Sequence, residues 1–264
     1  MAVAASDMAA WLAMRARTPL ALGILGGAVA RCGPALAPHV PSLARALRLP
    51  RRLELPGAVA LTFDDGPHPQ GTPAVLEILR EHHAVATFFL VGEQVRRTGA
   101  LIDEIRAAGH AVALHGDRHR TLLRLPARAL RDDLDRLADA LGAPTLPVHR
   151  APYGVYTRPA IAEVARRGWA PLLWSRWGRD WRARATPAGV AAEVTQDLRA
   201  GDVLLLHDAD DYSAPGSWRT TAAALPAVLD AIGAAGLRTA PVRLVPPPGG
   251  STAARTNGAR PPSR

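Results

Sequence analysis

The chain has 264 residues, of which 48% are apolar, enough for one large domain with a buried core or at most two small ones. Its formal charge is +9, and arginine supplies all of the lysine-plus-arginine total. The densest arginine runs, at 118–131 and 176–184, alternate with aspartates, so we interpret them as solvated surfaces and expect no nucleic-acid partner. Cys32 is alone, which excludes an intrachain disulfide and leaves the compartment undetermined.

Residues 1–56 form a lead-in with two possible roles. Arg15 and Arg17 precede an apolar run at 19–30 that ends in Ala-Val-Ala, a pattern similar to a secretory signal. Glycines interrupt the run, and it is too short for a stable membrane span, which needs about 20 apolar residues. The alternative, which we favour, is a helical lead-in at 9–30 and 40–48 that packs on the main domain. A signal would place the protein in the cell envelope or outside the cell, and its absence would place it in the cytoplasm.

From Val59 onward, strand-like and helix-like segments alternate along the chain. Strands are predicted at 59–63, 86–91, 111–114, 147–150, 170–175, 202–207 and 237–242. Helices are predicted at 72–82, 99–108, 126–141, 158–167, 186–200 and within 219–235, where Pro226 either kinks the helix or marks a later start. Such alternation predicts parallel βα units, and about seven units around one centre favour an α/β barrel over an open sheet. Residues 246–264 are rich in Pro, Gly and Ser and are expected to be a disordered tail.

The first predicted strand runs directly into two carboxylates, Asp64 and Asp65, and Gly66-Pro67 then turns the chain. At a strand end that turns in this way, both side chains can face a common cleft. Two carboxylates so close together do not both ionise cheaply unless a cation lies beside them. The pair therefore predicts a metal site, although Asp-Asp-Gly-Pro is also an ordinary polar turn.

Other polar residues lie at or just past the carboxyl ends of predicted strands, the edge where barrels of this kind place their chemistry. These residues are His115, Arg150, Asp180 and His207. The four-residue spacing of His115 and His119 brings both imidazoles to one side of a helical turn. With Asp65 they make a two-histidine, one-carboxylate set that suits Zn²⁺ or another divalent ion with an open position. Histidines without this arrangement are assigned to the surface or core: His68, His82, His83, His110 and His149.

Several runs of residues resemble the motifs of polysaccharide deacetylases of the NodB-homology type, carbohydrate esterase family 4. They are Thr62-Phe63-Asp64-Asp65-Gly66-Pro67, Ala86-Thr87-Phe88-Phe89, Arg150-Ala151-Pro152-Tyr153-Gly154, Asp180-Trp181 and Leu205-Leu206-His207. They follow the family's order over about residues 57–242. The resemblance implies a distorted (β/α) barrel and a catalytic domain at 57–245.

The resemblance also implies a reaction. The protein would be a metal-dependent hydrolase of carbon–nitrogen bonds other than peptide bonds, removing acetyl groups from an N-acetylated polysaccharide or oligosaccharide similar to peptidoglycan or chitin. Asp65, His115 and His119 would hold the metal, zinc or another divalent ion such as Co²⁺. Asp64 would be the general base that takes a proton from the metal-bound water.

The remaining roles follow from the same resemblance. Arg150 would keep Asp64 ionised and oriented. The backbone N–H of Tyr153 would stabilise the oxyanion. His207 would protonate the leaving amine, and Asp180 would raise the basicity of that histidine. The expected substrate-binding residues are Trp181, Leu205 and Pro152, the first two as walls of a small apolar pocket for the acetyl methyl group.

Two positions depart from the family's pattern. Gly116 stands where the family usually has Ser or Thr after its first metal-binding histidine, which would lower metal affinity unless Asp117 substitutes as a partner. Trp177 stands where a further Asp is usual, which puts hydrogen bonding near His207 in doubt, although an additional Trp could stack on a sugar ring.

These departures leave two other functions open. One is a catalytically impaired, carbohydrate-binding member of the family. The other is a hydrolase of another non-peptide amide, because the loops that select the substrate cannot be interpreted from the sequence. The expected partner is an N-acetylated glycan, and the protein is expected to be a monomer.

Overall fold

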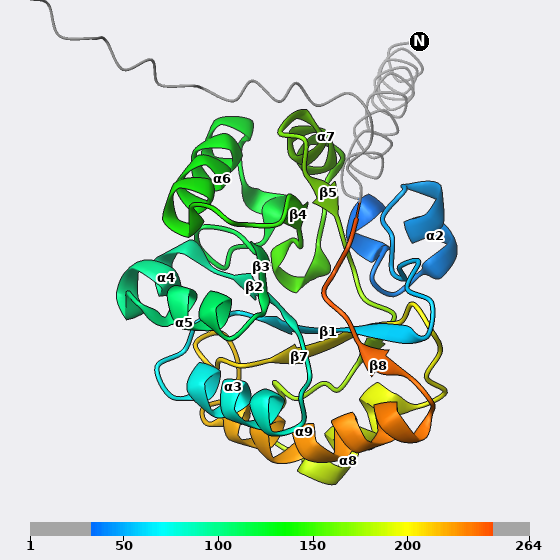
Figure 1. Ribbon diagram of the computed structural model, residues 1–264. Coiled ribbons are helices and arrows are strands. Elements are labelled where there is room, and N and C mark those ends of the chain that lie inside the picture. The colour runs from blue at the N-terminus through cyan, green and yellow to red at the C-terminus, as the bar shows by residue number, and fades with distance from the viewer. Residues whose placement is uncertain (1–32, 245–264) are drawn as a thin grey trace, which may run out of the picture.

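A curled parallel sheet forms the centre of the computed structural model, which describes residues 33–244 (Figure 1). The sheet has 8 strands in the order β5-β4-β3-β2-β1-β7-β6, with β8 paired to the start of β1. The strands are β1 (Ala58–Asp64), β2 (Thr87–Leu90), β3 (Ala111–Leu114), β4 (Val148–His149), β5 (Ala170–Pro171), β6 (Arg176–Trp177), β7 (Val203–His207) and β8 (Arg238–Thr239). Within the described residues no pairing joins β5 to β6, so the sheet curls without closing.

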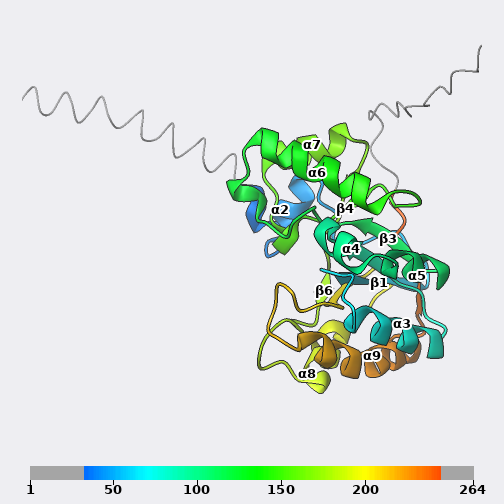
Figure 2. The same ribbon diagram turned by 90° about the vertical axis from the view of Figure 1, so that its left-hand side faces the viewer.

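Helices surround this sheet, with α6 and α7 at one end of the molecule and α3, α8 and α9 at the other (Figures 1 and 2). The helices are α2 (Pro41–Ala46), α3 (Gly71–Glu81), α4 (Gly92–Thr98), α5 (Leu101–Ala107), α6 (Ala127–Leu141), α7 (Arg158–Arg166), α8 (Pro187–Thr195) and α9 (Ser217–Ala234). Short 3₁₀ turns are η1 (Gly33–Leu36), η2 (Leu122–Arg124) and η3 (Pro152–Gly154). The architecture confirms the predicted distorted (β/α) barrel.

The central strand β1 fixes the position of the first carboxylates. All 7 of its residues are buried, because it has strands on both edges and helices beyond the sheet faces. Its residues 62–64 pair with β2 and its residues 60–64 pair with β7. The register sets Asp64 level with His207, so these two polar side chains leave the sheet at the same edge.

Some predicted elements differ from the observed ones. Helix α4 was not predicted, since its seven residues contain one large apolar side chain and give no periodic signal. The strand predicted at 170–175 ends at Pro171, because the following residues leave the sheet and Leu173 N–H donates to the carbonyl of Pro50 in the lead-in. The chain returns as the unpredicted β6. Pro226 lies inside α9, which starts before it and continues past it.

The lead-in predictions are only partly within the described residues. The helix predicted at 40–48 is observed as α2 at Pro41–Ala46. The helix predicted at 9–30, the alternative signal and the tail at 246–264 lie outside the described residues. Between residues 33 and 244, no helix combines the length and the apolar character that crossing a membrane requires.

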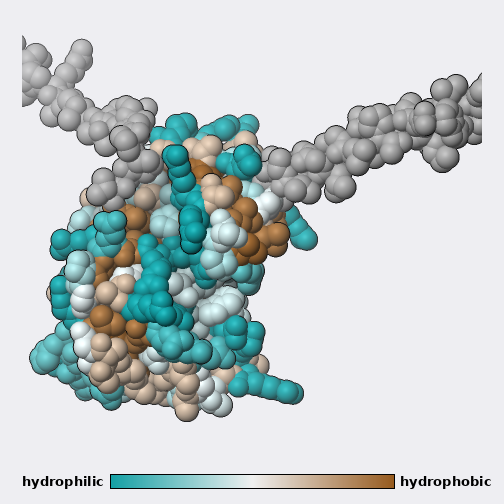
Figure 3. All heavy atoms as spheres, turned by 90° about the vertical axis from the view of Figure 1, so that its right-hand side faces the viewer, coloured by the Kyte–Doolittle hydropathy of each residue, from teal (hydrophilic) through white to brown (hydrophobic). Residues whose placement is uncertain are grey.

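The surface carries interspersed polar and apolar side chains, as the face in Figure 3 shows. Exposed arginines pair with acidic residues on the same helix, Arg80 with Glu77 and Arg166 with Glu163, each at 2.6 Å. Such exposed pairs contribute at most about 1 kcal/mol each, so stability resides in the buried sheet and the helices packed on it.

Substitutions at two helical glycines test how closely the helices pack on the sheet. A Cβ on Gly71, the first residue of α3, would overlap the carbonyl oxygen of Asp208 just after β7. We expect Gly71→Ala to lower the free energy of unfolding by about 2–3 kcal/mol, because α3 would have to move off the strand end. Gly233→Ala, in α9 with nothing within 4 Å, should instead raise it by roughly 0.5–1 kcal/mol. Urea unfolding followed by circular dichroism measures both, and equal effects would contradict the close approach at Gly71.

Candidate active site

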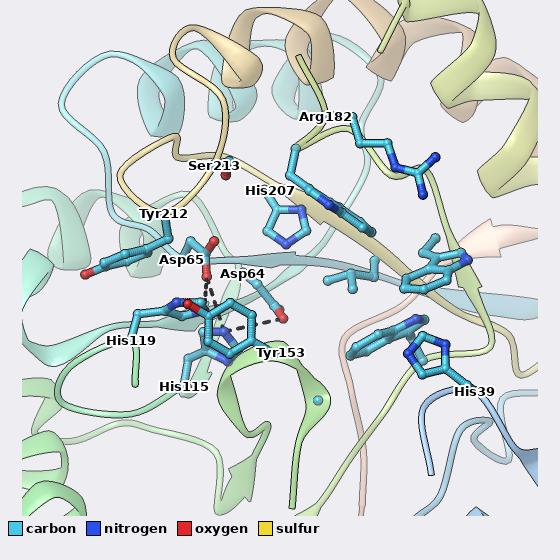
Figure 4. Close-up of a pocket in the computed structure, with 15 residues that line it drawn as sticks. His39, Asp64, Asp65, His115, His119, Tyr153, Arg182, His207, Tyr212 and Ser213 are labelled. Carbon is cyan, nitrogen blue, oxygen red and sulfur yellow. Dashed lines mark ion pairs between the residues drawn. The ribbon is translucent and has the colours of Figure 1, made fainter. Parts of the chain in front are cut away.

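A pocket of about 390 Å³ opens where the central strands end, and it gathers most of the polar residues singled out in the sequence (Figure 4). Asp64 and His207 are the last residues of β1 and β7. His115 directly follows β3, and His119 lies on the loop beyond it. Segments far apart in the chain meet here because parallel strands carry their carboxyl ends to one edge.

Backbone conformation turns both carboxylates into the pocket. On a regular strand, adjacent side chains point to opposite faces of the sheet. Asp65 breaks this alternation, since its φ of 78° lies in the left-handed region that few residues other than glycine adopt. Asp64 and Asp65 consequently both line the pocket, and each is almost fully buried.

Two imidazoles converge on Asp65. The Nε2 atoms of His115 and His119 each lie 3.2 Å from Asp65 Oδ1, the contacts dashed in Figure 4. Tetrahedral zinc, with bonds of about 2.0–2.2 Å, would hold its ligand atoms roughly 3.3–3.5 Å apart. Asp65 Oδ1 is buried and has no hydrogen-bond partner among the described residues. The unpartnered oxygen and its distances from the two nitrogens fit a divalent cation.

The charge of Asp65 suits the same interpretation. Burial alone would raise its pKa, but the neighbouring His119 and His115 hold the pKa well below its usual range. The carboxyl group is therefore ionised at neutral pH and available as a ligand.

The two histidines are oriented by different contacts. His115 Nδ1 lies 2.9 Å from the carbonyl oxygen of Arg150, which leaves Nε2 free to face Asp65. His119 Nδ1 has no hydrogen-bond partner in the part of the chain that is described. Its ring is held instead between two aromatic rings, stacked on Tyr212 and edge-on to Tyr153, each with centroids 4.4 Å away.

A buried ion pair positions Asp64. Arg150 Nη1 donates to Asp64 Oδ1 at 2.5 Å and to Thr62 Oγ1 at 2.9 Å. The guanidinium is fully buried and lies over the ring of Phe89, 3.9 Å from its centroid. The other carboxylate oxygen, Asp64 Oδ2, faces the cluster and lies 3.7 Å from His115 Nε2.

His207 is paired with a buried carboxylate. Its Nδ1 lies 2.9 Å from Asp180 Oδ1, while its backbone N–H donates to Asp180 Oδ2 and the Thr221 hydroxyl on α9 donates to that same oxygen. Burial alone would lower the pKa of His207, but Asp180, with smaller contributions from Asp65 and Asp64, raises it to about 10. Asp180 is thus not a surface partner of the arginines beside it in sequence, the alternative that its neighbours suggested.

The expected substrate-binding residues divide into two groups. Trp181 and Leu205 line the pocket, and the Trp181 ring stands edge-on to His207 with centroids 5.4 Å apart. Tyr153 also lines it, with a φ of 60° and a side chain more than half exposed. Pro152 is not among the lining residues; it is buried, and it lies against Gly116 in the loop that carries the histidines.

Comparison with known proteins gives consistent matches. The family model described as "Polysaccharide deacetylase" matches residues 54–171. A chitooligosaccharide deacetylase of Bradyrhizobium sp. (strain ANU 289) is 39% identical over 57% of this chain and 70% of that protein. Another, from Azorhizobium caulinodans, is 33% identical over 70% of this chain and 92% of its own length. A solved family 4 carbohydrate esterase from Streptomyces lividans, in complex with acetate, superposes with a TM-score of 0.62 at 28% identity, covering 70% and 92% of the two chains.

The chain belongs to the polysaccharide deacetylase family. This confirms the resemblance seen in the sequence motifs and the prediction of a hydrolase acting on carbon–nitrogen bonds other than peptide bonds.

The loop that carries the two histidines explains one departure from the family's pattern. Gly116 has a φ of 107°, which a side chain at this position would strain, and a Cβ would approach Pro152 and the carbonyl of Arg118. Asp117, which the sequence offered as a substitute for the missing hydroxyl, accepts from Arg96 at 2.6 Å and from Arg136 at 3.0 Å. The loop is therefore anchored through Asp117 and needs no hydroxyl at 116 for that purpose.

Sequence reasoning did not find several residues of the pocket. Tyr212 and Ser213 come from the loop after β7, and His39 comes from the lead-in. Thr221 on α9 does not line the pocket but donates to Asp180, the partner of His207. None of them stands at a strand end, so the rule that located the other residues gave no signal for them. Tyr212, five residues past His207, is the one whose proximity in sequence could have suggested it.

A second group of possible ligands, His68 with Asp210 and Asp211, is better explained as a structural network. His68 Nδ1 accepts from the backbone N–H of Gly71 at 2.9 Å, so the ring proton lies on Nε2, which points to Asp210 Oδ1 at 3.2 Å. A protonated Nε2 is no metal ligand, and Asp211 pairs with Arg97 at 2.9 Å. These contacts hold the loop after β7 in place.

Zinc titration distinguishes the two groups. We expect one tight zinc site per chain. His119→Ala should weaken zinc binding by more than about 100-fold, because losing the hydrogen-bond partner of a ligand already costs about 10–100-fold and losing the ligand itself should cost more. His68→Ala is the comparison and should change the affinity by only a few-fold, because His68 is no ligand and acts only through the loop that it holds. Competition with a chromophoric chelator measures both, and unchanged affinity in His119→Ala would refute the ligand set.

Proposed function

We propose that this member of the family is a metal-dependent N-deacetylase, hydrolysing acetamido groups of an N-acetylated polysaccharide or oligosaccharide. The observation that supports it most strongly is the convergence in one pocket of the Asp65, His115 and His119 cluster with Asp64 and His207 beside it. The named activity of the rhizobial relatives, chitooligosaccharide deacetylase, supports the substrate class.

Asp65, His115 and His119 are proposed as the ligands of a divalent ion, zinc being the expected one. Such an ion would supply Lewis acidity, which polarises a carbonyl group and lowers the pKa of a bound water molecule to near neutral. The protein's contribution is to hold the three ligand atoms in place through the Arg150 carbonyl on His115 and the tyrosine rings around His119.

Asp64 is proposed as the general base. Its Oδ1 is occupied by the Arg150 guanidinium, so the proton of the attacking water passes to Oδ2, the oxygen that faces the cluster. Arg150 and Thr62 fix the plane of the carboxylate, which keeps Oδ2 directed into the pocket.

His207 is proposed as the general acid. With Nδ1 directed at Asp180, the Nε2–H is the proton that the leaving amine would receive. A pKa of about 10 keeps the imidazole protonated at neutral pH, as an acid requires. Trp181 and Leu205 would enclose the acetyl methyl group beside it, and the backbone N–H of Tyr153 would donate to the developing oxyanion.

Acetate release from a panel of acetylated glycans, with and without a chelator, tests the proposal directly. We expect release from glycans, its loss on chelation and its recovery with Zn²⁺ or Co²⁺. Release from small amides alone would favour a hydrolase of another amide. Binding of glycans without any release by the metal-loaded protein would identify a catalytically impaired member of the family.

Asp64→Asn isolates the base. Asparagine keeps the shape of the side chain but cannot accept the proton, so kcat should fall by about 10²–10⁴-fold while zinc affinity stays within a few-fold of the wild type. Asp103→Asn, at an exposed position on α5, is the control for the lost charge. Retention of wild-type kcat in Asp64→Asn would remove this residue from the mechanism.

Asp180→Asn tests the acid through its pH dependence. The protonated form of His207 is active, so activity falls as the pH rises through the pKa of that histidine. Removal of the Asp180 charge lowers this pKa, and the basic limb of the kcat profile should move to lower pH. A basic limb that stays in place, in a variant with wild-type thermal stability, would end the assignment of His207 as the acid tuned by Asp180.

A further inference from the structure

The arginine run at 176–184 is not charge-balanced in the folded chain. Asp180 is its one aspartate, and it is fully buried with Oδ1 2.9 Å from His207 Nδ1, where it does not pair with the arginines beside it in sequence. Two arginines of the run pair with acidic residues from other segments. Arg182 and Arg184 are exposed, and in the described part of the chain no carboxylate forms an ion pair with either. These two cations are therefore available to a ligand.

A second cavity, of about 210 Å³, collects the arginine side chains. Arg179, Arg182 and Arg184 all line it, and we name it the arginine cavity. Glu193 of α8 is the one carboxylate among the described residues that line it, and it lies 3.2 Å from Arg179 Nη1. Three guanidinium groups therefore face a single carboxylate, so the cavity carries an excess of positive charge.

Backbone turns bring the three arginines together. Arg179 has a φ of 50°, in the left-handed region that few residues other than glycine adopt. The Arg182 N–H donates to the carbonyl of Arg179 at 3.3 Å, and the Ala185 N–H donates to the carbonyl of Arg182 at 3.0 Å. The Arg179 guanidinium also lies over the Trp177 ring, 5.1 Å from its centroid. The backbone thus sets the positions of the arginines before any ligand binds.

The arginine cavity adjoins the active-site pocket, because Arg182 lines both. Arg182 directly follows Trp181, the proposed wall for the acetyl methyl group. Figure 4 shows the Arg182 side chain on the far side of His207 from Tyr212. A group held in the arginine cavity can therefore belong to the same molecule whose acetamido group lies beside His207.

Guanidinium groups suit carboxylates and phosphates better than neutral hydroxyl groups. Their planar fork donates two parallel hydrogen bonds to such an anion, and these charge-assisted bonds are roughly twice as strong as neutral ones. A single exposed arginine without a partner is commonly only a solvated side chain. Three of them around one cavity repel one another, however, and Glu193 offsets only one of the charges, so an anion in the cavity would relieve the repulsion.

We infer that Arg182 and Arg184, together with Arg179, bind an anionic group carried by the glycan, a carboxylate or a phosphate, so that the preferred substrate is an acidic N-acetylated glycan. The inference rests on the proposed function, because it selects among the substrates of the same active site by their charge. It assigns the segment between β6 and α8 a role in substrate selection.

Steady-state kinetics on two matched trimers of N-acetylglucosamine test the inference. The acidic trimer carries a carboxymethyl group on each primary hydroxyl, and the neutral trimer carries a hydroxyethyl group there. We expect kcat/KM to be at least tenfold higher for the acidic trimer at low ionic strength. The difference should lie mainly in KM, because the anion makes the same contacts in the ground state and in the transition state.

Substitutions in the arginine cavity should reduce this acidic-to-neutral ratio of kcat/KM. Arg182→Gln and Arg184→Gln should each lower it about fivefold, the effect of one partly exposed charge pair. The double variant should bring the ratio close to one. Arg184→Lys keeps the charge but loses the two-bond fork, so it should retain more of the ratio than Arg184→Gln.

Arg158→Gln provides the matched control for the loss of one charge. Arg158 is exposed and begins α7, at the end of the molecule opposite α8 (Figures 1 and 2). Its substitution should leave the acidic-to-neutral ratio unchanged. An equal fall of the ratio in Arg158→Gln and Arg184→Gln would show that net charge alone attracts the acidic trimer, and would overturn the assignment of the cavity.

Calorimetric titration with inorganic sulfate separates a free anion from one carried by the glycan. We expect sulfate to bind much more weakly than the acidic trimer. Tight sulfate binding that Arg184→Gln abolishes, together with an acidic-to-neutral ratio of one, would show a site for a free anion and would overturn the inference.

Binding to Asp64→Asn tests the cavity independently of acetate release. The acidic trimer should bind at least tenfold more tightly than the neutral trimer, and addition of Arg184→Gln should reduce that difference about fivefold. Absence of acetate release from every glycan by the zinc-loaded protein would overturn the proposed function. Acetate release at equal efficiency from the two trimers, with equal binding of both to Asp64→Asn, would overturn the role of the arginine cavity alone.

Discussion

The arrangement of the site depends on one buried arginine side chain. Arg150 is fully buried, and its guanidinium donates to Asp64. Its carbonyl oxygen accepts a hydrogen bond from Nδ1 of His115. A buried ion pair adds little net stability, because the loss of hydration offsets most of the Coulomb attraction. Its effect here is geometric, since a single residue sets the orientation of the proposed base and of one proposed ligand.

The surrounding strands set the position of the Arg150 side chain. Arg150 follows β4, near the edge of the sheet, yet its side chain reaches the end of the central β1 through Thr62. Thr62 donates in turn to the carbonyl of Leu204 on β7, which ends at His207. The proposed base, ligand and acid are therefore connected across the sheet, through these hydrogen bonds and along β7, and a shift in any of these strands would disturb all three.

Whether a site residue could be predicted from the sequence depends on whether it lies at a strand end or on a loop. Asp64 and His207 end apolar strands, so the rule that parallel strands meet at one edge located them from the sequence. Tyr212 and His39 stand on a loop and in the lead-in, whose paths depend on tertiary contacts such as Pro38 on Gly154. The boundary between β5 and β6 was missed for the same reason, because a hydrogen bond to the lead-in draws the chain out of the sheet.

The central claim is that an ion binds between Asp65, His115 and His119. Anomalous diffraction at the zinc absorption edge, on crystals of the zinc-loaded protein, tests it most directly. The account predicts one dominant peak within bonding distance of Asp65 Oδ1 and both Nε2 atoms. A dominant peak at His68 and Asp210, or none among the three proposed ligands, would contradict it.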